Sequence, residues 1–428
     1  MAFTISRQPA VWSPVYNHLT YRVYSSKHSQ PQMKYIFDLY VNGTLVNTSK
    51  MFPRPDKYCH YDPSKIIQSY MYETFNNNIN TGTYAYTGET VNYYVVFKEE
   101  YMVGSTLTTY TRQTSMTRYT WMSAVQWEEG KNLSLFVDKL EPSLSNDQQD
   151  TAAEWCTVRK YIPTSDSLFN PIYANKIGIS ERRVETLMIR EYSTLYVPNT
   201  YWVLVACRDG GVKLLSKNLS LVTTQTESRY QFWHQPVGIE QLNSVSWSGS
   251  VVPPGKTVGI NPDEDLMYAI VFFRNSGGYL TMTHKIVTYY IDDCNKYDRY
   301  TVIYKHPYGG WGHVPMNKKS FMTESSKRSV MDTFVPYDCS TSSSSTKVSA
   351  INTRGIIELN SGFLNHQADV TNIVDMLRSP VIYLMNESNE YIPVIVKDTE
   401  YDIKNVAQDK MVEYTVKFEE AYDKNTTI

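Results

Sequence analysis

Alternating apolar and polar residues occur along much of the chain and predict β-strands. The pattern is clearest in residues 34–42, where every second residue is apolar (Tyr35, Phe37, Leu39 and Val41). This period of two is typical of a strand with one buried face. The Asn42-Gly43 dipeptide that follows favours a two-residue hairpin turn. Residues 44–50 are therefore predicted to return as the partner strand.

Similar short patterns predict many further strands. They cover residues 91–97, 106–112, 118–126, 134–140, 185–191, 194–197, 202–208, 212–216, 267–274, 279–284, 287–291, 299–305 and 311–315. Helical segments do not alternate regularly with these strands, as they would in a parallel nucleotide-binding sheet. The spacing indicates a mainly β protein built of several antiparallel, β-sandwich-like domains.

Two segments carry helical patterns. After Asp62-Pro63, a capping residue followed by a favoured first-turn residue, one helical face would hold Ile66, Ile67, Tyr70 and Met71. In Asn365–Arg378 the apolar residues Val370, Ile373, Val374 and Leu377 follow the i, i+3, i+4, i+7 spacing, and Pro380 ends the helix. Strands are predicted after it at 381–385, 392–397, 400–405 and 410–419. The C-terminal domain is thus predicted to be one amphipathic helix packed on a β-meander.

Polar stretches suggest the domain boundaries. The first is Thr223–Ser228, and the second is the Ser- and Thr-rich run Ser340–Thr346, interpreted as a loop or linker. We predict an N-terminal β-rich region in residues 1–225, with room for two sandwich modules. A middle β-sandwich domain follows in residues 226–325. The helix-plus-meander domain, with its Ser-rich linker, occupies residues 326–428.

Composition and charge narrow the classes of function. The chain has 41 basic and 43 acidic residues, a formal net charge of -2, which argues against specific nucleic-acid binding. It has 36 Tyr against only 14 Phe. Tyrosine is enriched both in strands and at protein interfaces. A β-rich fold and an extensive contact surface therefore explain the tyrosines about equally well.

The environment in which the chain folds is predicted from its start and its cysteines. The opening MAFTISRQPAVW lacks the charged-then-apolar pattern of a signal peptide, and no apolar run is long enough to span a bilayer. Five cysteines are scattered without paired spacing (Cys59, Cys156, Cys207, Cys294 and Cys339). We expect folding in a reducing cytoplasm, without disulfides and without direct membrane insertion.

The sequence gives only weak support for any catalytic or metal-binding group. Glu99-Glu100 and Glu128-Glu129 are adjacent carboxylates, but neighbours on a strand point to opposite faces, so solvated strand-end charges are the favoured interpretation. The run Asn261–Asp265 could begin a calcium loop, yet Leu266 replaces the required Gly, and an acidic turn is favoured. The histidines do not fall into zinc-ligand spacing (His60, His284, His306 and His313).

No acyl-transfer or nucleotide-binding motif is present in the sequence. We therefore predict no catalytic, metal-binding or cofactor-binding residue, and a protein that is not an enzyme.

Three aromatic clusters could instead stack on sugar rings. They are Tyr119 with Trp121 and Trp127, the run Phe232-Trp233-His234, and Tyr308 with Trp311. Tryptophan within a strand pattern usually lies in the core. Core packing is therefore the favoured interpretation of each cluster.

Several segments are similar to a known group of proteins. MKYIFDLYVNGTLV, MFPRPD and DPSKIIQSYM, then DCNKYDRYTVIYKHPYGGW, then TNIVDMLRSPVIYLMNESNEYIPVIVKDTEYDIK and KMVEYTVKFEEA occur in this order and cover about half the chain. They resemble structural proteins of tailed bacteriophages that infect gut Bacteroidota, including crAss-like phages. Two regions do not share this resemblance: residues 130–167, which resemble an insertion, and the Ser-rich run, which replaces a tighter linker.

The resemblance implies a virion component of the tail or neck, built of β-sandwich modules and present in symmetric copies, with no catalytic residues. The expected function is that of an oligomeric ring component (connector, tail hub or baseplate), folded in the host cytoplasm and located in the virion. Its expected partners are copies of itself and other phage tail or neck proteins. A receptor- or glycan-binding tail protein is the alternative. A tail-associated glycan hydrolase is the less favoured alternative, because it would need two facing carboxylates.

Overall fold

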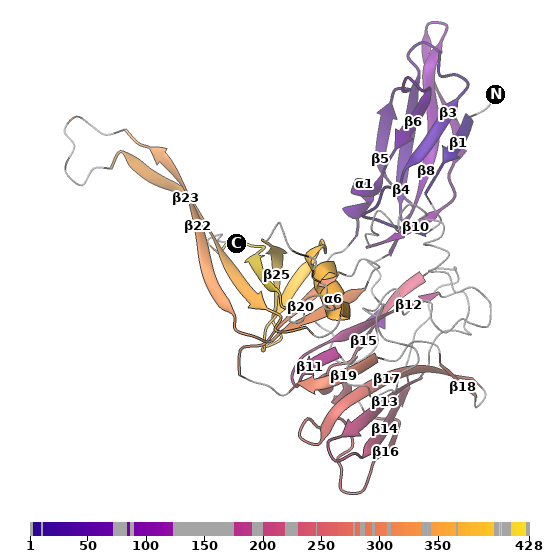
Figure 1. Cartoon of the computed structure of the whole chain (residues 1–428). Coiled ribbons are helices and arrows are strands. Elements are labelled where there is room, and N and C mark those ends of the chain that lie inside the picture. The colour runs from indigo at the N-terminus through magenta and orange to yellow at the C-terminus, as the bar shows by residue number, and fades with distance from the viewer. Residues whose placement is uncertain are drawn as a thin grey trace. The chain divides into compact units, whose positions relative to one another are not determined.

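The structure is a computed structural model in which β-strands predominate (Figure 1). It describes residues 3–9, 12–71, 84–85, 90–122, 175–190, 200–218, 230–244, 246–276, 279–282, 287–292, 296–305, 310–334, 337, 340, 344–364, 367–397, 402, 404 and 412–424. The chain divides into two compact units. Unit 1 holds Met1–Ala174, Arg183–Tyr289 and Lys305–Trp311, and unit 2 holds Asn175–Arg182, Tyr290–Tyr304 and Gly312–Ile428.

Unit 1 begins with two sheets. The smaller has the order β1 (Phe3–Arg7), β3 (Tyr21–Ser25), β6 (Tyr58–Tyr61). The larger has the order β2 (Trp12–Pro14), β10 (Arg118–Trp121), β8 (Thr90–Val103), β4 (Lys34–Val41), β5 (Thr44–Met51), with β9 (Thr106–Thr114) also paired to β8. The predicted hairpin is confirmed, because β4 and β5 pair across Asn42-Gly43 and both turn residues have positive φ (49° and 81°).

Aromatic side chains from both sheets meet in one core. Phe37 of β4 stacks on Tyr61 of β6, with ring centroids 4.7 Å apart. Phe97 of β8 lies edge-on to Tyr21 of β3 at 5.5 Å. All four side chains are fully buried or nearly so. The two sheets therefore face each other, as in the predicted β-sandwich.

The first predicted helix is short. Helix α1 spans Ser64–Gln68, and Ile67 and Met71 are buried as expected. Tyr70, predicted to share their face, is 44% exposed. That part of the prediction is wrong: α1 ends at Gln68, so Tyr70 lies outside the helix and does not follow the helical spacing, and Ile66 is half-buried.

Asp62 anchors the start of α1. Its Oδ1 accepts the backbone N–H of Ser64 at 3.0 Å and of Leu19 at 3.1 Å. Its Oδ2 lies 2.6 Å from Nδ1 of His18. Burial alone would raise the pKa of this carboxyl, but the hydrogen bonds from His18, Ser64 and Leu19 lower the pKa below its usual value.

We expect Asp62→Ala to lower the free energy of unfolding by about 1 kcal/mol at pH 7, the usual cost of removing a side chain that accepts backbone N–H groups at the start of a helix. A lowered folded-state pKa adds stability that is fully present above the unfolded pKa, near ~3.9, and is lost as pH falls through the folded pKa. The difference between the two chains should therefore shrink below about pH 4. Urea unfolding at pH 7 and pH 3 measures it. A difference that grows on acidification would contradict the assignment.

The rest of unit 1 contains most of a seven-stranded sheet and a smaller one. The larger sheet has the order β11 (Asn175–Gly178), β19 (Val287–Asp292), β17 (Asp265–Ser276), β13 (Thr200–Cys207), β14 (Val212–Asn218), β16 (Gly249–Val251), with β18 (Tyr279–Met282) paired to β17. The smaller has the order β12 (Val184–Arg190), β15 (Tyr230–Pro236), β7 (Tyr84–Ala85). Helix α5 spans Ile239–Asn243, and its Leu242 is buried.

The last sheet belongs mainly to unit 2. Its order is β21 (Trp311–Met316), β20 (Tyr300–Lys305), β24 (Ile382–Met385), β25 (Tyr391–Val396), β26 (Thr415–Glu420), β23 (Thr346–Asn360), β22 (Phe321–Asp332). Helix α6 spans Gln367–Leu377, which confirms the predicted helix over most of residues 365–378. Its Val370, Ile373 and Met376 belong to one buried cluster with side chains of these strands.

The predicted boundary at 325/326 falls inside β22. The Ser- and Thr-rich run 340–346 connects β22 to β23, which pair with each other from Phe321↔Glu358 to Asp332↔Thr346. The run therefore belongs to the connection of a hairpin, which agrees with the loop alternative of the prediction and not with the linker alternative. The boundary at 225/226 and the predicted strands at 134–140 and 194–197 lie outside the described residues.

Tyrosine fills much of the core. The largest fully buried side chains include Tyr21, Tyr35, Tyr61, Tyr93, Tyr201, Tyr268, Tyr289 and Tyr304. Some hydroxyls have backbone partners, such as that of Tyr268, which donates to the carbonyl of Val237 at 2.7 Å. For these eight tyrosines, burial in the core of a β-rich protein is a sufficient explanation.

Candidate interaction surfaces

The adjacent carboxylates Glu99 and Glu100 are buried rather than solvated, so that prediction is wrong. Glu99, 1% exposed, accepts from Nε of Arg112 at 2.6 Å. Glu100, 5% exposed, accepts from Nζ of Lys50 at 2.7 Å. Each carboxylate is paired with a cation on a different strand, Arg112 on β9 and Lys50 on β5. The two ion pairs therefore link neighbouring strands of the sheet, and the carboxylates do not face one shared site. The second pair, residues 128–129, lies outside the described residues.

The acidic turn at Asn261–Asp265 is present and encloses a buried lysine. Lys213 Nζ lies 2.9 Å from Asp265 Oδ2, 3.2 Å from Glu264 Oε2 and 3.3 Å from the carbonyl oxygen of Gly259. The side chains of Lys213 and Asp265 are both 0% exposed. The Lys213 ammonium thus lies against both carboxylates of this turn. Sequence reasoning missed it, although a lysine within the apolar stretch Val212–Leu215 was a usable signal.

Two tryptophans of the aromatic clusters are core residues. Trp121 is 0% and Trp311 is 6% exposed, with Lys305 Nζ 4.8 Å from the centre of the Trp311 ring. These results confirm core packing for the two tryptophans and remove them as sugar-stacking platforms. Tyr119 is half-buried and His234 of β15 is buried, whereas the side chains of Phe232 and Trp233 lie outside the described part of the chain. Trp127 and Tyr308 lie outside the described residues.

The histidines and cysteines that the structure describes do not gather into one site. His60 lies on β6 and His313 on β21, and both are half-buried. Cys59 and Cys207 are free and buried. Within the part of the chain that the structure describes, no three His, Cys, Asp or Glu side chains are grouped to hold a metal ion. His284 and His306 lie outside that part.

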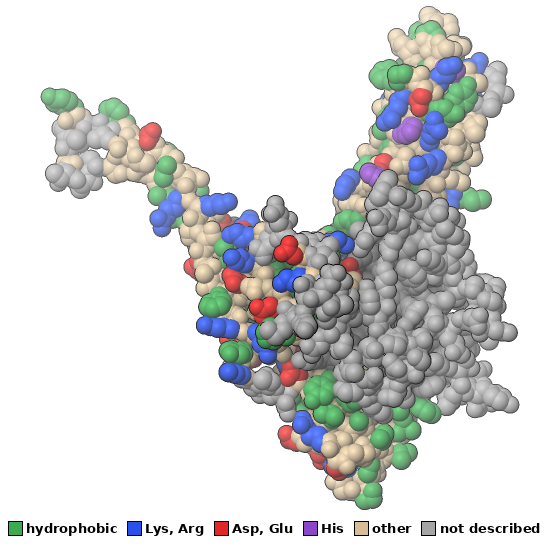
Figure 2. All heavy atoms as spheres, in the orientation of Figure 1, with side chains coloured by type: hydrophobic (Ala, Val, Ile, Leu, Met, Phe, Trp, Pro, Cys, Tyr) green, Lys and Arg blue, Asp and Glu red, His purple; other side chains and the backbone are tan. Residues whose placement is uncertain are grey.

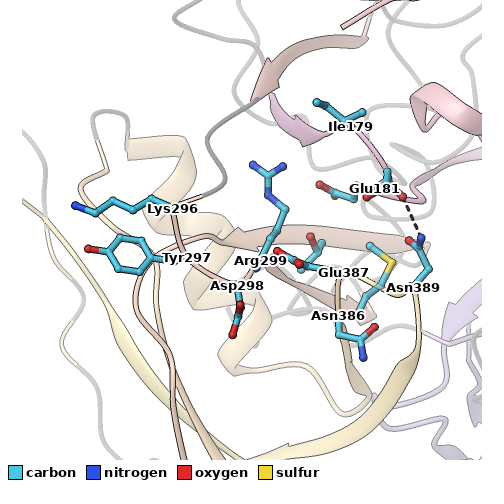
Figure 3. A pocket seen from close by; sticks show the side chains of 12 residues that line it. Ile179, Glu181, Lys296, Tyr297, Asp298, Arg299, Asn386, Glu387 and Asn389 are labelled. Atoms are coloured by element: carbon cyan, nitrogen blue, oxygen red, sulfur yellow. Dashed lines mark hydrogen bonds between the residues drawn. The ribbon is translucent and has the colours of Figure 1, made fainter.

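Unit 2 has an open polar cavity of about 550 Å³, to which Glu181, Tyr297, Arg299, Glu387 and Asn389 contribute (Figure 3). Asn389 donates to the carbonyl of Ser180 at 3.0 Å and accepts the backbone N–H of Arg182 at 3.2 Å. Glu387 accepts the backbone N–H of Arg299 at 2.9 Å. These bonds hold the β24–β25 turn against residues 180–182 and beside residue 299, so the polar lining has a structural role.

The most exposed element of unit 2 is the hairpin formed by β22 and the outer half of β23. We call residues 321–352 the arm. Every β22 side chain is exposed except that of Ser325, which is half-exposed, and residues 346–352 of β23 are all exposed. The arm extends well beyond the other strands of its sheet, with apolar side chains toward its end (Figures 1 and 2).

One face of the arm continues the buried face of its sheet. Alternate residues of β23 are buried from Leu359 back to Thr353, and Ile351 is the next on that face. Ile351 pairs with Arg328, and two residues further along β22 Val330 lies opposite Val348. Val330, Val348 and Ile351, which we call the arm apolar face, are 64%, 50% and 42% exposed. The end of the arm adds Phe334 and Tyr337, 91% and 106% exposed.

A second apolar surface lies on the seven-stranded sheet that contains β13, β14 and β16. Strand β13 is apolar on both sides, because Val203 and Val205 point into the core while Leu204 points outward, half-exposed. Leu204 lies opposite Leu214, which lies opposite Val251 of the edge strand β16. Val212 shares this face; it is 50% exposed and Val251 is 69% exposed. We call Leu204, Val212, Leu214 and Val251 the sheet apolar face. Antiparallel sheets that face water usually carry polar residues on the outer side.

No protein-family model matches this sequence, and a search of curated proteins gave no match. None of the helices described is long and apolar enough to cross a membrane.

Proposed function

We propose that this chain is a virion structural protein of a tailed bacteriophage. In this proposal it is an oligomeric ring component of the tail or neck, and it acts by assembling with copies of itself and with other tail or neck proteins. The arm is the observation that carries the proposal. The resemblance of the quoted segments to phage tail and neck proteins supports the location in the virion.

The physical argument starts from the instability of an isolated hairpin. A two-stranded ribbon in water is marginally stable at best and gains stability by packing on a further layer. Residues 324–332 of β22 nevertheless pair with residues 346–355 of β23 beyond the stretch of β23 that pairs with β26, and Val330, Val348 and Ile351 lie on one face. Exposed apolar surface next to an edge strand promotes pairing with another chain. A protein that functions in an assembly uses such a surface as a subunit contact.

Closed rings arise when one patch repeatedly meets a different patch on the next copy. The arm provides a projecting patch of this kind, and every copy carries one. A tail or neck must surround a channel for the genome, and a ring of identical subunits forms such a channel. The chain is not proposed to be an enzyme, to use a cofactor or to bind specific nucleic-acid sequences.

The test is the assembly state of the purified full chain, measured by mass photometry and by electron microscopy of stained particles. We expect closed rings for the unmodified chain. Val330→Asp together with Val348→Asp should weaken assembly at least 100-fold, because each aliphatic side chain contributes about 1.5–3 kcal/mol when fully buried and 1.4 kcal/mol is a factor of ten.

The matched control is Met331→Asp, which adds the same charge on the opposite face of the arm, where Met331 pairs with Lys347 and is 52% exposed. It should retain assembly close to that of the unmodified chain. A full chain that stays monomeric at all concentrations, and that touches no sister copy in a virion, would refute the proposal.

A further inference from the structure

We infer that the outer face of the three-stranded sheet formed by β1, β3 and β6 binds a phosphate monoester. The inference goes beyond the proposed function and does not depend on it. Four side chains carry it: Arg7, Arg22, Arg54 and His60, which we call the basic face. Lys and Arg side chains gather over this part of unit 1 (Figure 2).

Three of these residues form one row across the three strands. Arg7 of β1 lies opposite Arg22 of β3, which lies opposite His60 of β6. The neighbours of Arg22 along β3, Tyr21 and Val23, are fully buried, so Arg22 and its row point away from the core. Like charges directly opposite each other on adjacent strands are destabilising. The folding of the sheet therefore does not explain the row.

The charge of the basic face matches that of a phosphate monoester. Residues 1–37 contain no Asp or Glu, although acidic residues outnumber basic ones in the whole chain. The carboxylate of Asp56 lies 3.6 Å from Nη2 of Arg22 and offsets one of the three guanidinium charges of the face. A phosphate monoester has a charge of about -1.5 to -2 at pH 7, so it balances the other two better than a carboxylate or a phosphate diester, which has a single charge.

Arg22 is held in a geometry that suits an oxyanion. Its guanidinium carbon lies 3.7 Å from the centre of the Tyr58 ring, and its side chain is 38% exposed. A guanidinium that stacks on an aromatic face keeps its N–H edge available for bidentate binding of phosphate. Nε of Arg22 and Nε2 of His60 have no hydrogen-bond partner among the described residues. The basic residues therefore do not satisfy one another, and an oxyanion would add acceptors to this face.

The environment of His60 places Arg54 on the same face. Burial lowers the pKa of the His60 imidazole below its usual value, and the positive charge of Arg54 is the next largest cause. Arg22 and Arg7 act in the same direction, and Asp56 acts against them. A bound phosphate dianion would offset the positive charges and raise this pKa. The pKa of His60 therefore reports whether phosphate binds at the basic face.

Isothermal titration calorimetry of the full chain with inorganic phosphate, at pH 7 and constant ionic strength, tests the inference. We expect one phosphate to bind per chain. Arg7→Gln and Arg54→Gln should each weaken binding at least tenfold, because each removes a charge-assisted hydrogen bond. Both side chains are exposed, so neither change should affect folding. The matched control is Arg208→Gln, which removes an exposed guanidinium just after β13 and should leave the affinity within twofold.

Nuclear magnetic resonance of histidine locates the site. In a chain labelled with ¹³C-histidine, His60→Gln identifies the signal of His60 among the eight histidines. A pH titration with and without phosphate should show that phosphate raises the pKa of His60. The rise should be smaller in the chain with Arg54→Gln, which binds phosphate less tightly.

The class of ligand is tested with further titrations. Glucose 6-phosphate and vesicles containing phosphatidic acid both present a phosphate monoester, whereas dimethyl phosphate and acetate each carry one negative charge. We expect at least one of the monoesters to bind ten or more times tighter than dimethyl phosphate or acetate. The monoester whose binding Arg54→Gln weakens distinguishes a sugar phosphate from a lipid headgroup as the source.

Three outcomes would overturn the inference. The first is that inorganic phosphate and both monoesters fail to bind, or that inorganic phosphate binds and neither monoester does. The second is that acetate binds as tightly as phosphate, which would show only a general attraction of anions. The third is binding that Arg7→Gln and Arg54→Gln leave unchanged, with no change in the pKa of His60, which would place the site elsewhere. The proposed function depends on the arm and stands or falls separately.

Discussion

Replacing Lys213 with methionine is expected to lower the free energy of unfolding by about 3–5 kcal/mol, because it leaves a buried carboxylate without its cation. Lys213 and Asp265 are both fully buried, and Nζ lies 2.9 Å from Oδ2. Typical domains are stable by about 5–15 kcal/mol, so this single change removes a large fraction of the total. Urea unfolding followed by tryptophan fluorescence gives the difference.

A surface pair in the same region is the matched control. Lys256 Nζ lies 2.8 Å from Asp209 Oδ2, and the Asp209 side chain is 57% exposed. Lys256→Met should cost less than about 1 kcal/mol, because solvent screens exposed ion pairs. Combining Lys213→Met with Asp265→Asn should recover part of the loss, since the amide removes the unpaired charge and its oxygen can still accept the N–H of Asn261. Equal effects of Lys213→Met and Lys256→Met would contradict the assignment.

The parts of the fold that the sequence predicted are those with a local signal. The hairpin at Asn42-Gly43 follows from residues that accept positive φ, and α6 follows from the spacing of Val370, Ile373 and Val374. Strand β17 contains the predicted strand 267–274, and β4 and β13 cover all but the last residue of the segments predicted at 34–42 and 202–208. In each case the signal depends on residues adjacent in the sequence or within two helical turns.

The arm was not predicted because its strands lack a buried face. The β22 sequence FMTESSKRSVMD shows no period of two, since neither face had to be apolar for the packing of unit 2. The Ser-rich run then resembled a linker, although it connects two paired strands. A strand that pairs with one neighbouring strand and packs on no further layer does not need alternating apolar residues, so its sequence pattern does not reveal it.

Burial of the charged residues depends on partners that are distant in the sequence. Glu100 is neutralised by Lys50, fifty positions away, and Lys213 by Asp265, fifty-two positions away. A sequence read in short windows cannot show such a pairing, so Glu99 and Glu100 resembled solvated strand ends. The same limit applies to the sheet apolar face, which exists only because β14 lies between β13 and β16.

Shortening the arm is expected to abolish assembly and to leave unit 2 folded. Ser326 and Thr353 lie directly opposite each other, with hydroxyl oxygens 2.9 Å apart. Replacing residues 327–352 with Asn-Gly joins them through a two-residue hairpin turn. The described core of unit 2 contains Ile357 and Leu359 of β23 but no residue of the arm. The shortened chain should therefore unfold within about 1 kcal/mol of the full chain, in the range usual for surface changes.

The same chain should be monomeric by mass photometry at concentrations where the full chain forms rings, because Val330 and Val348 are gone. Removing only residues 335–343 is the matched control. It shortens the loop, keeps both valines on their strands and should still allow rings to form. A chain without residues 327–352 that assembles normally would show that the arm is dispensable. One that loses its near-ultraviolet circular dichroism would show instead that the arm contributes to the fold of unit 2.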